Sequence, residues 1–253
     1  MRNVVAHYHV FKNAGVSVDA TLRAILPNGY FQVEATPSKP LAPGCFAAFI
    51  ESHPEGVLFS SHTALFPVPE IEDVQIFPII FVRHPIDRLR SVYEFERRTP
   101  LIRGQVGELG VAVAKELPFP EYVKWRFERL DGTLDNHHVR RFSAGIGPEV
   151  TLEAAKAYTE RLPFVGVVEH FDASMHKLKR CLSDLFPLCE APVRHYNQTP
   201  GRLSSLEARI ALIRAELGDA LYEKVLEHNQ DDLALYEVVC CRNGFDANSN
   251  GAA

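Results

Sequence analysis

A lysine and a glycine near the start of the chain stand between an apolar run and a helical pattern, in the sequence Lys12-Asn13-Ala14-Gly15. The run from Val4 to Val10 predicts a buried strand, and apolar residues recur at helical spacing over 18–25. A tight turn between strand and helix directs free backbone amides, the positive end of the helix dipole and one lysine into the same small space. The pattern therefore predicts a site for a phosphate or a sulfate ester. The alternative is an ordinary connection with a solvated lysine.

A second basic group follows another apolar run further along the chain. Ile79 to Val82 is unbroken and apolar, as is typical of a strand covered on both faces, and it ends in Arg83. Pro85 suits a first helical turn, and apolar residues then recur at helical spacing over 86–93. Arg83 at the strand end and Ser91 two turns into this helix are placed to reach a second phosphate. A rigid guanidinium fork suits that role better than an ammonium group.

The segments HVFKNAGVS and FVRHPIDRLRSVY resemble the two cofactor-binding signatures of sulfotransferases that use 3′-phosphoadenosine 5′-phosphosulfate, particularly carbohydrate sulfotransferases related to the heparan 2-O-sulfotransferases. The resemblance implies that the first loop cradles the 5′-phosphosulfate and that Arg83 and Ser91 hold the 3′-phosphate. The matching loop positions are Lys12, Asn13, Ala14, Gly15, Val16 and Ser17. The chain departs from the family at Phe11, where proline is usual, and at Val16, where threonine is usual. The second departure removes a hydroxyl donor.

A histidine ends the apolar segment VLFSSH, at position 62. Histidine suits proton removal near neutral pH. In the family that the chain resembles, a histidine just past the second strand is the proposed general base, and SSHTAL matches that position. The resemblance therefore implies that His62 takes a proton from the acceptor hydroxyl, while Lys12 stabilises charge on the leaving phosphate. His53, Glu94 and Glu96 are competing candidates for the base.

Two further segments resemble family segments near the nucleotide. In DNHHVRRFSAG the matching positions are Asn136, Arg140, Arg141, Ser143 and Gly145, and we include Arg141 in the predicted cofactor site. In HYNQTPGR, which resembles a loop that closes over the cofactor, the candidates are Asn197, Thr199 and Arg202. Glu169, after a late apolar run, is predicted either to orient His62 or a loop amide, or to begin a helix.

No metal site is predicted. His137 and His138 are adjacent and would point apart on a helix, and no third ligand lies at a telling spacing. The chain has 5 cysteines, an odd number without the paired spacing of a zinc site. We interpret them as reduced thiols, which agrees with a cytoplasmic location.

Composition limits the partners. The 253 residues are 46% hydrophobic and 23% charged, as in ordinary globular proteins, and no apolar run approaches the roughly 18 residues of a membrane span. We therefore expect a cytoplasmic protein without a membrane span, unless an N-terminal anchor has been removed. The net charge of −5 disfavours nucleic acid and other polyanions as partners. Positive charge must then be local, at Lys12 and Arg83, with Arg88, Arg140 and Arg141 as further sources.

The pattern as a whole predicts an α/β protein, and the resemblance implies a three-layer P-loop-like fold with a central, mostly parallel sheet flanked by helices. We expect a single domain over 1–245 and a disordered tail over 246–253. Predicted strands cover 4–10, 57–62, 79–82 and 164–171, and 31–35 and 45–50 are strands or short helices. The single tryptophan, Trp125, either stacks on a sugar or completes the core, and the core is favoured.

The predicted function is transfer of a sulfuryl group from 3′-phosphoadenosine 5′-phosphosulfate to a hydroxyl, on a saccharide or glycoconjugate. One alternative is a nucleotide-dependent kinase, although no Gly-x-x-x-x-Gly-Lys-Ser/Thr string occurs. The other is a nucleotide-binding module without turnover. The sequence does not identify the acceptor, whose specificity we expect to lie in the loops 27–56 and 99–118, and it does not give the oligomeric state.

Overall fold

A parallel sheet forms the centre of the molecule. The computed structural model describes residues 1–26, 28–35, 41–102, 104, 107–129, 131–196 and 203–249. Four strands pair in the order β2-β3-β1-β4, and every pairing is parallel. Their bounds are Arg2–Tyr8 for β1, Tyr30–Gln32 for β2, Leu58–Ser61 for β3 and Val74–Ile79 for β4. A second parallel pair, β5 (Phe81–Val82) and β6 (Gly166–Val167), continues beyond β4.

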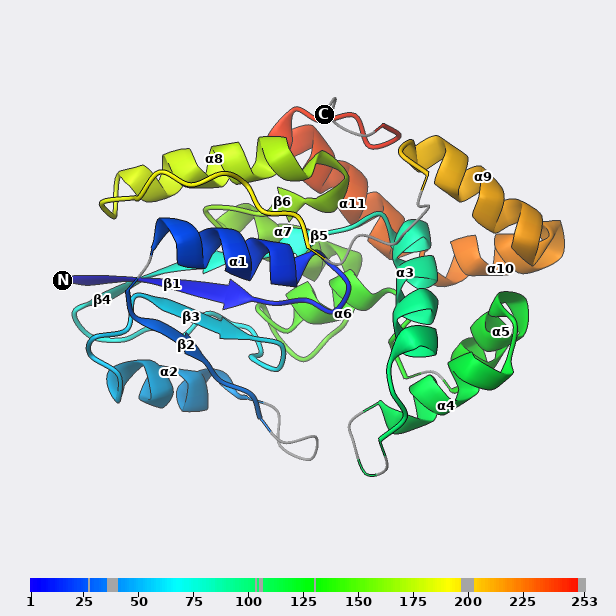
Figure 1. The fold of residues 1–253 in the computed structure, drawn as a ribbon, viewed down its shortest axis with the longest axis horizontal. Coiled ribbons are helices and arrows are strands. Elements are labelled where there is room, and N and C mark those ends of the chain that lie inside the picture. The colour runs from blue at the N-terminus through cyan, green and yellow to red at the C-terminus, as the bar shows by residue number, and fades with distance from the viewer. Residues whose placement is uncertain are drawn as a thin grey trace.

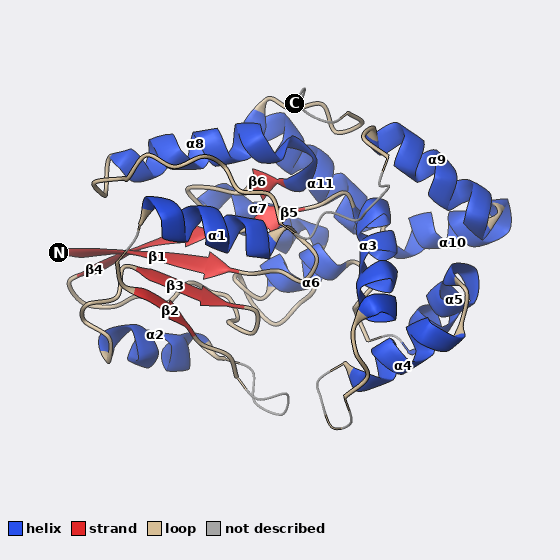
Figure 2. Ribbon diagram, viewed as in Figure 1, coloured by secondary structure: helices blue, strands red, loops and turns tan. Residues whose placement is uncertain are grey.

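Helices cover both faces of the sheet (Figures 1 and 2). On one face lie α1 (Gly15–Ile25) and α8 (Phe171–Ser183), whose apolar side chains pack in one core cluster. On the other face lie α2 (Pro43–Glu51), α6 (His137–Ser143), α7 (Leu152–Arg161) and α11 (Gln230–Asn243). The central strand β1 serves both clusters because its side chains alternate, with Val4 and Ala6 on one side and Val5 on the other.

A helical layer stands beyond the carboxyl ends of the strands and has its own apolar cluster (Figure 1). Its members are α3 (Pro85–Arg98), α4 (Glu108–Glu116), α5 (Phe119–Arg129), α9 (Leu206–Leu217) and α10 (Asp219–His228). Since α3 begins directly after β5, it joins this layer to the sheet. The edge at which parallel strands end is where open α/β sheets bind ligands.

The predicted α/β class and the mostly parallel sheet are confirmed, and two local predictions need correction. Of the two alternatives for residues 45–50, the short helix is the one observed, since Ala42 and Pro43 begin helix α2 there. Of the strand predicted over 164–171, only Gly166–Val167 pairs, and a 3₁₀ helix over Val168–His170 then leads into α8. The start of the tail predicted to be disordered is packed: Ala247 contacts the core.

No helix within the described ranges is long and apolar enough to cross a lipid bilayer.

Candidate functional site

The loop between β1 and α1 has an unusual backbone. Lys12 and Ala14 have φ angles of 65° and 60°, in a region that side-chain-bearing residues rarely adopt. Ala14 caps α1 without a side-chain hydrogen bond. Within the described part of the chain, the backbone amides of Lys12, Ala14, Gly15 and Val16 have no hydrogen-bond acceptor. Successive free amides of this kind form a concave site that suits an anion.

The Lys12 side chain remains available for an anionic ligand. Its Nζ lies 4.3 Å from the centroid of the Phe95 ring, and it forms no ion pair with a carboxylate of the described residues. Burial and the neighbouring cations Arg83, Arg98 and Arg88 lower the pKa of Lys12 to about 8. Positive charge is thus concentrated around Lys12, and no carboxylate of the described ranges is paired with it.

The two sequence motifs meet in space. Arg83 Nη1 donates a hydrogen bond to the carbonyl oxygen of Lys12 at 3.1 Å. The guanidinium is buried, and its Nε and Nη2 both bond Asp87 Oδ2, at 2.9 and 2.7 Å. Asp87 also accepts a bond from Arg209 Nε at 2.8 Å. Arg83 therefore holds the backbone of the loop in place, and its guanidinium is already paired with a carboxylate.

Arg88 is a second brace under the same loop. It is 2% exposed, and its Nε donates to the carbonyl of Phe11 at 3.2 Å while Nη1 donates to that of Thr133 at 2.7 Å. Its Nη2 is buried without a partner in the described part of the molecule. Burial lowers the pKa of Arg88 to about 10. Since the described hydrogen bonds of Arg88 go to carbonyl oxygens, its charge adds to the positive potential around the loop.

Asn13 faces the core, away from the free amides of the loop. Its side-chain Nδ2 donates to the carbonyl of Phe81 at 2.6 Å and lies 2.8 Å from His138 Nε2. His138 Nδ1 in turn lies 3.0 Å from Asp232 Oδ2. This buried chain of hydrogen bonds connects the loop to β5, α6 and α11. The sequence reasoning missed Asp232, and considered His138 only as a weak zinc ligand.

The other predicted cofactor residues differ in their surroundings. Ser17 Oγ accepts a bond from the Tyr196 amide at 2.8 Å, so the segment before residue 197 covers it. Val16 is 45% exposed and Ser91 is half-buried. The Ser91 hydroxyl has no hydrogen-bond partner among the described residues. Arg141 Nη2 donates to the carbonyl of Ala64 at 2.7 Å. It thereby supports the segment that follows β3.

The remaining family-matched positions have structural contacts or lie outside the described residues. Ser143 Oγ donates to the carbonyl of Thr151, and Arg140 pairs with Asp135 at 2.7 Å. A Cβ on Gly145 would lie 2.4 Å from the Tyr158 ring. Asn197, Thr199 and Arg202 lie outside the described residues.

His62 lies at the end of β3, beside the loop. Its Nδ1 is 2.7 Å from Glu34 Oε1, and its ring centroid lies 3.7 Å from that of His9. The side chain is 42% exposed. Glu169, one candidate for orienting His62, instead accepts the amide of His84 at 3.2 Å. That part of the prediction is corrected: the carboxylate beside His62 belongs to Glu34.

A cluster that sequence reasoning missed lies behind the loop. His7, His9 and Asp19 place ligand atoms within 4.8 Å of one another and are the described residues whose arrangement could hold a metal ion. Asp19 already accepts hydrogen bonds at 2.7 Å from His7 and at 2.9 Å from Ser60. His7 and His9 hold the pKa of Asp19 well below its usual range, although burial opposes this. The alternating positions 7 and 9 were the available signal, since His7 lies in β1 and His9 follows one residue after its end, on the same side of the extended chain.

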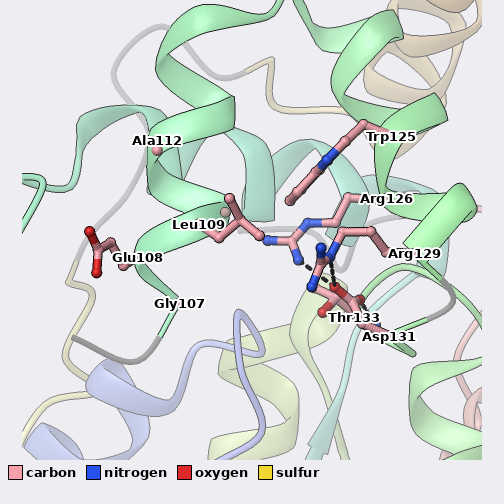
Figure 3. Close-up of a pocket in the computed structure, with 10 residues that line it drawn as sticks. Gly107, Glu108, Leu109, Ala112, Trp125, Arg126, Arg129, Asp131 and Thr133 are labelled. Atoms are coloured by element: carbon pink, nitrogen blue, oxygen red, sulfur yellow. Dashed lines mark hydrogen bonds and ion pairs between the residues drawn. The ribbon is translucent and has the colours of Figure 1, made fainter. Parts of the chain in front are cut away.

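A pocket of about 560 Å³ opens in the helical layer between α4 and α5 (Figure 3). Trp125, Arg126 and Arg129 from α5 face it, with the guanidinium carbon of Arg129 5.3 Å from the Trp125 ring centroid. Asp131 and Thr133 complete that wall, and Asp131 pairs with Arg126 at 2.8 Å. None of the predicted cofactor residues lines this pocket. Trp125 packs against the apolar cluster of the helical layer, as expected, and it also lines the pocket wall.

Fold and site together define an α/β protein whose parallel-strand ends bring together a loop with free backbone amides, the Lys12 side chain and a histidine-carboxylate pair. The chain is 35% identical over 251 residues to an uncharacterized protein of Archaeoglobus fulgidus, in an alignment that spans 94% of this chain and 96% of the archaeal protein. It therefore belongs to the same family as that protein. No family model matches the chain.

Proposed function

We propose that the protein is a sulfotransferase that moves a sulfuryl group from 3′-phosphoadenosine 5′-phosphosulfate to the hydroxyl of a saccharide or glycoconjugate. The observation that carries the proposal is the meeting of the two motifs, in which Arg83 bonds the carbonyl of Lys12 at 3.1 Å. The β1–loop–α1 unit at the centre of a parallel sheet also supports the finer proposal of a P-loop-like fold.

In this proposal the loop residues bind the donor. The four free amides of the loop and the Lys12 ammonium hold the 5′-phosphosulfate, because both are positive and neither has a hydrogen-bond acceptor among the described groups. Ser91 supplies a hydroxyl for the 3′-phosphate. Arg83 keeps its bond to Asp87, so it positions the loop and contributes its charge at short range.

His62 acts as the base. Transfer is in line, and the main work of the protein is positioning and fixed electrostatics. His62 accepts the hydroxyl proton of the acceptor, and Lys12 stabilises the negative charge that grows on the leaving phosphate. The half-exposed position of His62 gives the acceptor access to it.

We place the acceptor on the side of the pocket in Figure 3. Thr133, on its wall, and Phe11, in the donor loop, share the guanidinium of Arg88, so the pocket adjoins the loop. An aromatic face with an adjacent cation, as Trp125 and Arg129 provide, suits a sugar ring.

Turnover with a radiolabelled sulfate donor tests the proposal. The assay offers a panel of neutral and acidic oligosaccharides and measures label transferred to the sugar. We expect label in at least one acceptor, lost in a Lys12→Met variant and retained in Lys224→Met, which removes an exposed lysine from α10. Binding of the donor product without transfer to any acceptor would favour a nucleotide-binding module. Phosphate transfer from ATP with magnesium would favour a kinase.

A further inference from the structure

Glu34 lies opposite His62 because of strand register. β2 and β3 pair in parallel with Tyr30 opposite Leu58 and Gln32 opposite Ser60, so the same offset carries Glu34 to His62 just beyond the strand ends. Both residues therefore leave the sheet at its carboxyl edge, side by side. Strand register alone therefore places Glu34 beside His62, whether or not the two side chains form an ion pair.

The Glu34 carboxylate holds both the ring and the backbone of His62. Oε1 lies 2.7 Å from His62 Nδ1, and Oε2 accepts the His62 amide at 3.0 Å. Thr63 Oγ1 and Gln32 Nε2 add bonds of 3.1 and 3.2 Å. Burial alone would raise the pKa of Glu34, but the bonds from His62 and its amide lower that pKa to about 2. The carboxylate is therefore ionised and can only accept hydrogen bonds.

An acceptor at Nδ1 decides the tautomer of a neutral imidazole. The proton must reside on Nδ1, which leaves the lone pair on Nε2. Within the described part of the molecule, His62 Nε2 has no hydrogen-bond partner, and the side chain is 42% exposed. Nε2 is thus the ring nitrogen that can take a proton.

His9 fixes the face of the same ring. The His9 and His62 ring centroids lie 3.7 Å apart with planes tilted by 31°. The His9 ring packs directly against Gly15 of the loop, where a Cβ would come within 1.8 Å of His9 Cδ2. Burial lowers the pKa of His9 to about 4, so the stacked ring is neutral at pH 7 and does not repel a protonated neighbour. His9 therefore links the position of His62 to that of the donor loop.

We propose that Glu34 and His9 are positioning residues that clamp His62, Glu34 at one edge and His9 at one face, so that Nε2 receives the acceptor proton. The inference rests on the proposed function. In the step it serves, the acceptor oxygen bonds to sulfur, the bond from sulfur to the leaving phosphate oxygen breaks, and the hydroxyl proton moves to His62 Nε2. Arg141, whose Nη2 lies 3.4 Å from the His62 carbonyl oxygen, steadies the backbone of the same segment.

Nitrogen-15 NMR of the histidine rings tests the clamp directly in the full chain, without any nucleotide. A His62→Gln variant identifies the His62 signals. We expect the Nδ1–H tautomer at His62 in the unaltered protein and in Glu34→Gln, whose amide oxygen still accepts, and a shift towards Nε2–H in Glu34→Ala. Glu121→Gln, which alters an exposed pair on α5, is the control and leaves the His62 tautomer unchanged.

Kinetics give the second measurement. Glu34→Ala and His9→Ala should each lower kcat by about tenfold to a hundredfold, with little change in KM for the donor, because the base is misplaced while the loop remains. His9→Phe, which keeps a stacking ring, should recover most of the His9→Ala loss. An Nε2–H tautomer in the unaltered protein, or full kcat in Glu34→Ala, would overturn this inference. A protein that does not bind the donor nucleotide would instead overturn the proposed function, and the tautomer result would still stand by itself.

Discussion

The two strand ends that the sequence presents as equivalent phosphate anchors differ in the folded protein. At the end of β1, Lys12 has no carboxylate partner in the described ranges, and four backbone amides around it are open. At the end of β5, Arg83 is buried, holds Asp87 through two nitrogens and holds the loop through a third. The end of β1 therefore presents polar groups that no described residue bonds, whereas Arg83 at the end of β5 is engaged with Asp87 and with the carbonyl of Lys12.

A basic residue at a strand end is therefore not by itself evidence that its charge is free to bind an anion. A guanidinium buried beneath the loop would cost several kcal/mol if unpaired, so the fold supplies Asp87, and Asp87 in turn is shared with Arg209. An ammonium on a half-exposed stem needs no such partner, and aromatic contact with Phe95 suffices. The following variants test whether the end of β1 binds the nucleotide while the end of β5 stabilises the fold.

The largest effect is expected from Asp87→Asn. The substitution leaves the buried guanidinium groups of Arg83 and Arg209 without their shared carboxylate. We expect a loss of about 3–5 kcal/mol in the free energy of unfolding. Urea denaturation followed by circular dichroism measures it. A change below about 1 kcal/mol, the range of an exposed ion pair, would show that this end is not a structural centre.

Lys12→Met should leave stability almost unchanged and damage function. The lysine has no ion pair to lose among the described groups, but its charge faces the proposed phosphosulfate. We expect kcat/KM to fall by about 10² to 10³-fold, as when one preorganised electrostatic contact is removed. Steady-state rates with Lys224→Met as the control measure it. If Lys12→Met instead unfolds the protein, the contrast between the two ends fails.

Nucleotide affinity should depend on pH through Lys12. Its pKa in the folded protein is about 8, so the binding cation is present below that pH and is lost above it. Affinity for the donor product should fall by about tenfold between pH 7 and pH 9. Stability moves in the opposite sense: between pH 8 and the ordinary lysine pKa of 10.5 the unfolded chain binds more protons at Lys12 than the folded protein does, so the unliganded protein gains stability across that window. A Lys12→Arg variant, which stays charged, is expected to show neither trend.

The smallest effect is expected from Ser91→Ala. The hydroxyl has no described partner, so stability should change by less than about 0.5 kcal/mol. Loss of one hydrogen bond to a phosphate should weaken nucleotide binding by about 3- to 30-fold. Calorimetry with nucleotides that carry or lack the 3′-phosphate isolates this contact. Equal weakening for both nucleotides would assign Ser91 a different role.

The sequence predicted the parts of the fold that depend on local pattern. The strand β1 and the helix after Pro85 both follow from apolar spacing and turn chemistry. The late strand was overestimated, because an apolar run that enters a buried 3₁₀ turn looks the same in sequence as one that pairs in a sheet.

Only those residues of the candidate site that directly follow a predicted strand could be predicted from the sequence. Lys12 and Arg83 stand next to recognisable turns, and His62 ends an apolar run. Glu34, His9 and Asp232 act through partners that are distant in the chain, as in the bond between Asp232 and the His138 amide at 3.0 Å. Such contacts depend on strand register and helix packing, which no single segment of the sequence specifies.

Isothermal titration calorimetry with 3′-phosphoadenosine 5′-phosphate, set against ATP with magnesium, decides whether the Lys12 loop belongs to a sulfate-donor site. We expect one binding site for 3′-phosphoadenosine 5′-phosphate, abolished in Lys12→Met, with ATP and magnesium binding at least tenfold more weakly. Equal or tighter binding of ATP with magnesium, or no binding of 3′-phosphoadenosine 5′-phosphate by the folded protein, would contradict it.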